Sequence, residues 1–338
     1  MSGYKKLALV LGALLIFALA LTACGSQPTP APVQPATEAP AATPTKAPPT
    51  EAPKEEKPTE APTATPTEAP AATEAPAAED LLDEVMAAGK LVVSTDPNYA
   101  PQSFLNDAGE LDGFDVDVAK EVAKRLGVEV EFVTPEWDII TGGNWSGRWD
   151  VSIGSMTPTE PRSEVLWFTD PYYYVPAAFA VHKDNTDIKT PDDLTGKRVG
   201  LGTATTYEDY LKGELSIMGG GEIMYDPPSG VEIAPYPTDG DAIQDLALGD
   251  GVRLDAVMSA QPTIQTAIDS GVPLKYVGTP AFYEPLVFAL DKSRGPSDKM
   301  LAKLNEILAE MHSDGTLTDL SEKWYGLDYT TVVSPENK

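Results

Sequence analysis

Arg162 stands in a sequence context that could hold a carboxylate group. Thr157 and Glu160 have the spacing of a helix capping box, and Pro158 would occupy the first helical position. The sequence therefore predicts a helix that begins at this point, with Arg162 on its first turn. A guanidinium beside the free N–H groups of a helix start can fix both oxygens of a carboxylate by charge-assisted hydrogen bonds. The alternative is an exposed arginine that pairs with Glu160 or Glu164.

A second segment, residues 202–206 (Gly-Thr-Ala-Thr-Thr), also offers backbone N–H groups at a predicted strand-to-helix turn. It lacks the lysine and the spacing of a phosphate-binding loop, so we do not expect nucleotide binding. The chain has two histidines, His182 and His312, which lie far apart in the sequence, and one cysteine, Cys24. We therefore expect no disulfide, no metal centre and no cofactor.

The elements that must position these residues are short β-like runs that alternate with amphipathic helices, a pattern typical of an α/β fold. One helix is expected over residues 115–126, because Val118, Val122 and Leu126 recur four apart and Gly127 follows. The other expected elements are helices over residues 297–312 and 316–324, and strands over residues 91–95, 128–134, 150–153, 177–181, 197–201, 254–258 and 286–290.

The N-terminus has the features of an export signal. Lys5 and Lys6 precede an uncharged run over residues 7–21, which has about the length of a signal-peptide apolar region. The motif Leu-Thr-Ala-Cys-Gly that follows resembles the bacterial lipobox, in which the cysteine is acylated and becomes the first residue. We therefore expect a signal peptide over residues 1–23 and a lipid on Cys24 that anchors an extracytoplasmic chain to the membrane. The alternative is a plain secretory signal with an incidental cysteine.

Residues 24–79 are expected to form a disordered tether. From residue 25 on, this segment has no aromatic residue, and it contains 14 of the chain's 32 prolines. It cannot bury enough apolar surface to offset the entropy that is lost on ordering. Its composition of proline, threonine, alanine and glutamate favours a semi-stiff chain with polyproline II character.

The remainder of the chain has the composition of a globular protein and keeps a strong negative charge. The whole chain has a net charge of −28. Residues 80–338 contain 19 lysines and arginines against 44 aspartates and glutamates, which gives them a net charge of −25. A field of this sign argues against nucleic acid or anionic lipid as the main binding partner.

Five motifs follow one another along residues 90–326. They are residues 91–101 (Leu-Val-Val-Ser-Thr-Asp-Pro-Asn-Tyr-Ala-Pro), 113–120 (Gly-Phe-Asp-Val-Asp-Val-Ala-Lys), 149–157 (Trp-Asp-Val-Ser-Ile-Gly-Ser-Met-Thr) with Arg162, 168–174 (Phe-Thr-Asp-Pro-Tyr-Tyr-Tyr), and 314–326, which begins Asp-Gly-Thr-Leu and ends Glu-Lys-Trp-Tyr-Gly. Together they resemble the family 3 extracellular solute-binding proteins, the receptors for polar amino acids in ABC importers.

The resemblance implies a two-lobed, type II periplasmic-binding-protein-like α/β fold. Each lobe would be a mixed sheet with flanking helices, and the ligand would lie in the cleft between the lobes. Two crossovers would join them. Lobe 1 would comprise residues 80–175 and 285–338, and lobe 2 residues 176–284.

The resemblance also implies roles for individual residues. Arg162 and Thr157 would bind the α-carboxylate of the ligand, with backbone help from Thr206 across the cleft. Gly154 or Ser155 would offer a carbonyl or hydroxyl group to the α-ammonium.

The side-chain pocket of such a protein would contain Asp96, Tyr99 and Trp137. An aspartate there suits a cationic or amide side chain, and an aromatic face favours a cation. The alternative for the two aromatic residues is plain packing at the edge of the lobe. Trp145 and Trp149 lie in a stretch that replaces a regular helix of the family, and they are expected either as pocket walls or as core.

One departure from the family concerns the α-ammonium. The strand that resembles residues 254–259 is usually followed by an aspartate that pairs with this group, but Ala260 stands there. A buried ammonium without a carboxylate would be unfavourable. Either another acid compensates, for which Glu284 and Glu136 are the candidates, or the ligand has no free α-amino group.

These features predict a lipid-anchored, extracytoplasmic binding protein that closes on a small polar amino acid or related carboxylate-bearing solute. Its expected partners are that solute, the permease subunits of an ABC importer and the membrane through the lipid on Cys24. We expect a monomer that is not an enzyme. The alternatives are a dehydratase-like enzyme on the same fold and a surface-tethered ligand sensor.

Overall fold

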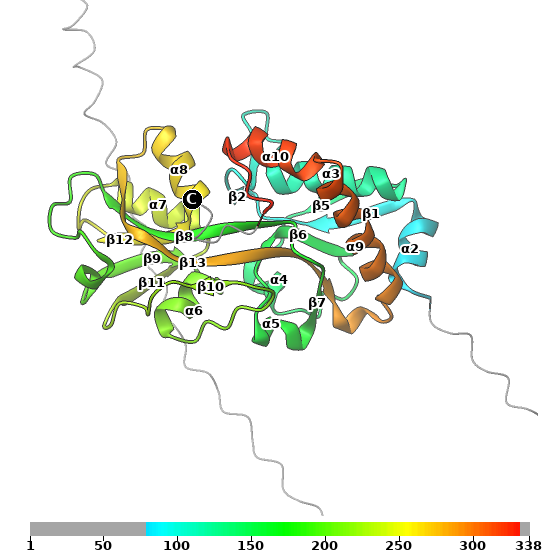
Figure 1. Ribbon diagram of the computed structural model, residues 1–338, viewed down its shortest axis with the longest axis horizontal. Helices are drawn as coiled ribbons and strands as arrows, with labels where there is room; N and C mark the ends of the chain where they lie inside the picture. Colours follow the sequence, from blue (N-terminus) through cyan, green and yellow to red (C-terminus); the bar gives the residue numbers. More distant parts are fainter. Residues whose placement is uncertain (1–78, 332–338) are drawn as a thin grey trace, which may run out of the picture. The chain divides into compact units, whose positions relative to one another are not determined.

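A mixed β-sheet forms the centre of the protein, whose computed structural model describes residues 79–331 (Figure 1). The predicted signal peptide, the lipid site Cys24, the tether up to residue 78 and the tail from residue 332 lie outside the described residues. The strand order from edge to edge is β11 (Glu232–Tyr236), β9 (Arg198–Gly202), β12 (Ala256–Ala260), β8 (Tyr173–His182), β13 (Leu274–Asp291), β6 (Val151–Met156), β1 (Lys90–Ser94) and β5 (Glu129–Val133).

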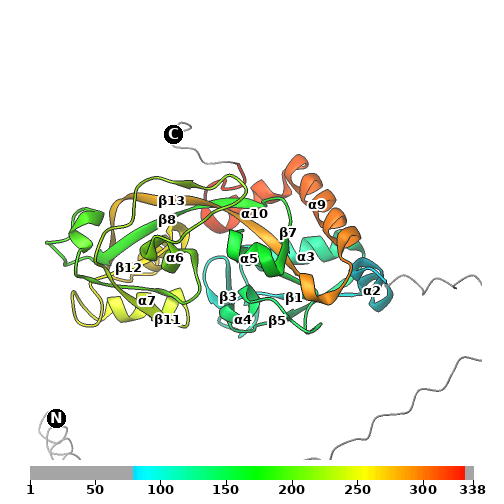
Figure 2. The ribbon, with the colours of Figure 1, turned by 90° about the horizontal axis from the view of Figure 1, so that it is seen from below.

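The long strand β13 joins the two halves of this sheet. Its residues Leu274 to Leu286 pair with β8, while Val287 to Asp291 pair with β6 and with the short strand β7 (Leu166–Phe168). Figures 1 and 2 both show that β13 extends from one half of the sheet into the other. We call the half that contains β1, β5, β6 and β7 lobe 1, and the half that contains β9, β11 and β12 lobe 2. The residue limits predicted for the lobes stay predictions.

Lobe 1 has helices on both sides of its strands and a small second sheet. Its helices are α2 (Leu81–Ala88), α3 (Phe114–Leu126), α4 (Trp137–Thr141), α5 (Glu160–Val165), α9 (Asp298–Ser313) and α10 (Thr316–Tyr325), with the short 3₁₀-helix η2 (Lys292–Arg294); the second sheet contains β2 (Asn98–Tyr99), β3 (Ser103–Leu105) and β4 (Leu111–Asp112).

The predicted helix at residues 115–126 is confirmed as α3. Val118, Val122 and Leu126 are buried against the sheet, and Gly127 ends the helix with a φ of 78°, which a residue with a side chain rarely adopts. The predicted strands and the two C-terminal helices are confirmed as well, with their ends shifted by a few residues at most, except that residues 177–181 and 286–290 belong to the longer strands β8 and β13.

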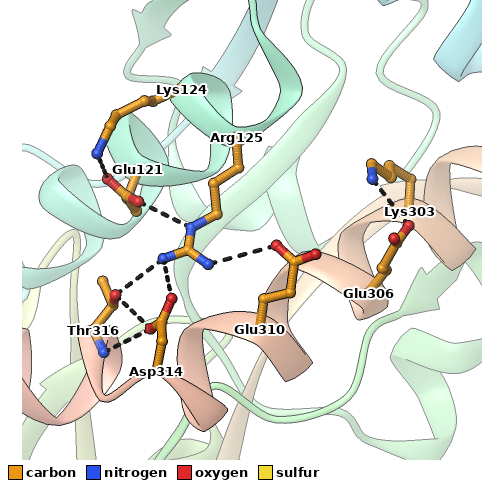
Figure 3. Close-up of polar contacts among 8 residues, drawn as sticks. All are labelled: Glu121, Lys124, Arg125, Lys303, Glu306, Glu310, Asp314 and Thr316. Carbon is orange, nitrogen blue, oxygen red and sulfur yellow. Dashed lines mark hydrogen bonds and ion pairs between the residues drawn. The ribbon is translucent and has the colours of Figure 1, made fainter.

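Arg125 on α3 binds the C-terminal helices α9 and α10 through hydrogen bonds and an ion pair (Figure 3). Its guanidinium donates to Glu121 on the same helix at 2.9 Å, and to Asp314 and Thr316 at 2.8 and 3.0 Å. Glu310 on α9 lies 3.5 Å from the guanidinium. Hydrogen bonds from Thr316 and from the guanidinium lower the pKa of Asp314 to about 2. This contact holds the turn between α9 and α10 on lobe 1.

Lobe 2 has three helices around its strands: α6 (Thr206–Lys212), α7 (Asp239–Ala247) and α8 (Gln261–Asp269). It also contains the 3₁₀-helix η1 (Pro191–Leu194) and the short strand β10 (Glu222–Ile223), which pairs with β13. The hydroxyl groups of Thr205 and Thr238 accept hydrogen bonds from the first turns of α6 and α7, so both helices begin at a residue that favours this position.

Trp145 and Trp149 belong to the core of lobe 1. Their ring centroids lie 5.0 Å apart, and both side chains are buried in a cluster with Ile140, Met156 and Leu166. Neither ring borders the cavity described below. Of the two expectations for these tryptophans, packing in the core is the one that the structure supports.

Within residues 79–331, every helix is too short or too polar to cross a lipid bilayer.

Candidate functional site

A cavity of about 40 Å³ lies between the two lobes. Elements of both lobes and the middle of β13 contribute to its wall. The structure brings together at this cavity all nine residues that were predicted to contact a ligand, which are Asp96, Tyr99, Trp137, Gly154, Ser155, Thr157, Arg162, Thr206 and Glu284. Their individual roles in binding stay predictions. Ligand sites commonly measure about 300–1,000 Å³, so an amino acid can enter this cavity only when the lobes separate.

The helix that carries Arg162 begins later than predicted. Thr159, not Thr157, caps α5, and its hydroxyl accepts a hydrogen bond from the Arg162 backbone N–H at 3.4 Å. The capping box predicted between Thr157 and Glu160 is therefore wrong. Thr157 instead donates its hydroxyl proton to Glu284, far along the chain on β13. Arg162 still lies on the first turn, as expected.

The guanidinium of Arg162 spans the cleft. It donates to the Thr157 carbonyl oxygen of lobe 1 at 2.9 Å and to the Ala204 carbonyl oxygen of lobe 2 at 2.8 Å. Its carbon lies 5.5 Å from the centroid of the Trp137 ring, whose N–H donates to the same Ala204 oxygen at 3.2 Å. Burial lowers the pKa of Arg162, although an arginine stays protonated in proteins. The positive charge is thus held at the boundary of the lobes by carbonyl groups that a ligand carboxylate could replace.

Glu284 lies where β13 passes from one lobe to the other. Its carboxylate accepts hydrogen bonds from the hydroxyl groups of Thr157, Thr206 and Tyr207, the last two at 2.7 and 3.2 Å. Burial raises the pKa of Glu284, while these hydroxyl groups and Arg162 oppose the rise. The other candidate for a compensating acid, Glu136, is exposed and does not line the cavity.

Ser155 is held by a buried aspartate that sequence reasoning missed. Its hydroxyl donates to Asp115 at 2.6 Å, and the hydroxyl of Tyr172 donates to the other oxygen of Asp115 at 2.6 Å. Burial raises the pKa of Asp115 to about 7. Because the Ser155 hydroxyl donates to Asp115 and also bonds the Tyr173 hydroxyl at 2.5 Å, its side chain can offer a ligand only one remaining lone pair. Within a predicted helix start, Asp115 looked like an ordinary first-turn acid.

Asp239 is a second acid at the cavity that sequence reasoning missed. It is buried at the start of α7, where the Gly202 N–H and the Ser259 hydroxyl donate to its two oxygens, each at 2.7 Å. A β-carbon at Gly202 would lie 2.8 Å from the same carboxylate, so this close approach requires glycine. Local sequence around Thr238 signals a helix start, and nothing in it signals a binding residue.

The two lobes also touch directly, in part through residues that line the cavity. The Tyr99 and Tyr207 hydroxyl groups lie 3.0 Å apart, and Thr263 donates to Gln102 at 3.2 Å. Together with the contacts of Arg162 and Trp137 to lobe 2, these bonds define a closed arrangement.

The loop between α6 and β10 adds a backbone connection between the lobes. The Met218 N–H donates to the Pro158 carbonyl oxygen at 2.9 Å, and Ile217 forms an antiparallel bridge with Thr159. The loop therefore lies against the start of α5, the helix that carries Arg162.

Comparison with known proteins places this geometry in a family. The model of the "Bacterial extracellular solute-binding proteins, family 3" matches residues 91–327. The L-cystine-binding protein TcyJ of Escherichia coli (strain K12) is 35% identical over 257 residues, which cover 75% of this chain and 88% of that protein.

Solved structures show the same architecture. An ancestral arginine-binding protein bound to arginine matches with a TM-score of 0.61 and 34% identity, over 70% of this chain and 99% of that chain. The ancestral amino acid-binding protein AncCDT-1, described as a precursor of cyclohexadienyl dehydratase, matches with a TM-score of 0.62 and 33% identity, over 72% of this chain and 99% of that chain. The predicted two-lobed, type II fold is thereby confirmed.

Proposed function

The chain belongs to the bacterial extracellular solute-binding proteins of family 3, and on that premise we propose that it is the lipid-anchored receptor of an ABC importer. Its solute is a small polar amino acid or a related compound with a carboxylate. One observation carries this proposal. A buried arginine and buried carboxylates line the same cavity between two lobes, which is the charge pattern that a zwitterion requires.

In the proposed complex, the α-carboxylate of the solute binds Arg162 and Thr157, and Thr206 contacts it from the facing lobe. The carboxylate replaces the carbonyl oxygens of Thr157 and Ala204 as acceptor for the guanidinium. Glu284 pairs with the α-ammonium. It thereby replaces the aspartate that the family usually has at the position of Ala260. Only the closed state offers all of these contacts, so the solute shifts the population of the lobes toward closure.

A cleft enzyme is the second candidate, because one structural neighbour is described as the precursor of a dehydratase and two buried acids here have pKa values near 7. Such an acid can exchange protons at neutral pH. Of these two, Asp239 lines the cavity and Asp115 does not. A binding protein releases its solute unchanged, whereas an enzyme releases a product.

To test the function, the chain is purified with Cys24→Ser, and the compounds that leave it on denaturation are identified by mass spectrometry. We expect an intact amino acid, and we expect the same compound to bind again in isothermal titration calorimetry. A chemically altered compound would favour the enzyme. Failure of all twenty amino acids and of related carboxylates to bind would exclude the proposed receptor.

The lipid anchor is tested by the same substitution in a bacterial host. We expect Cys24→Ser to move the chain from the membrane fraction to the soluble fraction outside the cytoplasm, because an acyl chain supplies about 0.8 kcal/mol of membrane affinity per buried CH₂ group. Detergent phase partitioning of the wild-type chain and of Ser26→Ala, a nearby hydroxyl-removing control, measures the effect. Partitioning of the wild-type chain into the aqueous phase, as expected of an unacylated chain without its signal peptide, would contradict a lipid on this residue.

A further inference from the structure

The charges that line the cavity do not balance for a simple zwitterion. Among the described residues that line it, Arg162 is the single cation, whereas Asp96, Asp239 and Glu284 are acids. A zwitterion brings one negative charge to Arg162 and one positive charge to a single carboxylate. Two carboxylates would then remain in a closed cavity without a partner, which is unfavourable.

Glu284 is the acid best placed for the α-ammonium. Arg162 donates to the Thr157 carbonyl oxygen and Glu284 accepts from the Thr157 hydroxyl, so the two charged groups contact the same residue. The α-carboxylate and α-ammonium of an amino acid are likewise close together, because they are attached to one carbon atom. A carboxylate close to the arginine therefore serves the ammonium, and the solute side chain extends toward the acids that remain.

Asp239 and Asp96 come from opposite lobes. Asp96 follows β1 in lobe 1 and is half-buried, while Asp239 begins α7 in lobe 2 and is only 6% exposed. Asp239 is held in place by Gly202 and Ser259, but it forms no ion pair with any described residue. Both of its bonds come from neutral donors, so no described cation pairs with its charge when the lobes close.

The raised pKa of Asp239 agrees with its burial without an ion-pair partner. Burial, together with the negative charges of Asp96 and Glu284, raises the pKa of Asp239 to about 7, although the hydrogen bonds from Ser259 and Gly202 oppose the rise. The other titratable groups that face it are Tyr99 and Tyr207, whose own pKa values are also raised by burial and by Asp239. A cation in the cavity would reverse this repulsion.

We propose that Asp239 determines the specificity of this protein: with Asp96 it forms a site for a second positive charge on the solute, one carboxylate from each lobe. The solute is then an amino acid with a cationic side chain, and this inference rests on the proposed function. In residues 79–331, no three acidic, histidine or cysteine side chains are placed so that they could hold a metal ion. Two acids that repel each other favour separation of the lobes, and a cation between them favours closure.

The test compares Asp239→Asn with the wild-type chain by isothermal titration calorimetry at pH 8. Cationic probes are L-arginine, L-lysine and L-ornithine, and neutral probes are L-citrulline, which has nearly the shape of arginine, and L-glutamine. We expect the wild-type chain to prefer a cationic probe, and Asp239→Asn to weaken that binding at least about thirtyfold, as the loss of a buried charge partner does. Its binding of the neutral probes should change less than about threefold, which also verifies the fold.

Asp269→Asn is the matched control, since it removes the same charge from an exposed position of lobe 2, at the end of α8 and outside the cavity. It should bind every probe as the wild-type chain does. A further readout is the proton released on binding of the cationic probe at pH 7, measured in buffers of different ionisation enthalpy. The wild-type chain and Asp269→Asn should release a proton, and Asp239→Asn should release less.

The outcomes separate the two proposals. Binding of no amino acid would exclude the proposed function itself. Binding of neutral amino acids as tightly as cationic ones, or equal losses of both kinds in Asp239→Asn, would overturn the inference about Asp239 and leave the receptor function in place.

Discussion

Arg162→Ala should reduce the affinity for the amino acid solute by about thirtyfold to several thousandfold. This change removes the single cation among the described residues that line the cavity, and loss of one partner of a buried, hydrogen-bonded charge pair costs about 2–5 kcal/mol. Glu284 also loses the nearby positive charge that opposes the rise of its pKa. Isothermal titration calorimetry with the solute recovered from the wild-type chain measures the loss.

Two further variants show which property of the arginine matters. Arg162→Lys keeps the charge but not the two parallel donors, so its affinity should lie between those of the alanine variant and the wild-type chain. Arg148→Ala removes an equal charge from an exposed residue outside the cavity and should leave binding unchanged. Wild-type affinity in Arg162→Ala would show that the solute carboxylate binds elsewhere.

Much of the fold could be predicted from the sequence, because local patterns determine its elements. Apolar residues at helical spacing and a terminal glycine identify α3, and runs of valine, isoleucine and leucine identify β1, β6 and β9. Most of the nine predicted ligand contacts stand at strand ends or helix starts that face the other lobe, whereas Glu284 lies within β13 where this strand passes between the lobes.

The residues that sequence reasoning misplaced depend on contacts between distant segments. Thr157 and Thr159 each precede a proline by one or two positions, so both fit a helix cap equally well by local pattern. The bond from Thr157 to Glu284 decides between them, and only the folded chain brings these residues together. Asp239 likewise has the local sequence of a helix start, and its place at the cavity follows from the packing of α7 against Gly202 and Ser259.

Asp115 should make the protein less stable as the pH rises from about 4 to 7. Its carboxyl group has the ordinary aspartate pKa of 3.8 in the unfolded chain, but a pKa of about 7 in the folded state. Between these values the folded state binds more protons than the unfolded state, so the free energy of unfolding falls as the pH rises and levels off above about 7. A shift of this size corresponds to about 4 kcal/mol. Asp239, whose pKa is also raised to about 7, likewise lowers the free energy of unfolding as the pH rises. Asp314 has a pKa lowered to about 2, so it changes the free energy of unfolding only below about pH 4.

Asp115→Asn isolates the contribution of this one group to the pH dependence. The amide can accept a hydrogen bond from Tyr172 and donate one to Ser155, and it carries no charge that must be buried. In urea unfolding of the solute-free chain, the variant should therefore lose less stability than the wild-type chain between pH 5 and pH 8. Asp107→Asn, the same change on an exposed loop of lobe 1, should keep the wild-type slope. Equal slopes for Asp115→Asn and the wild-type chain would mean that Asp115 is ionised in the folded state throughout this range, and that Ser155 and Tyr172 stabilise its charge fully.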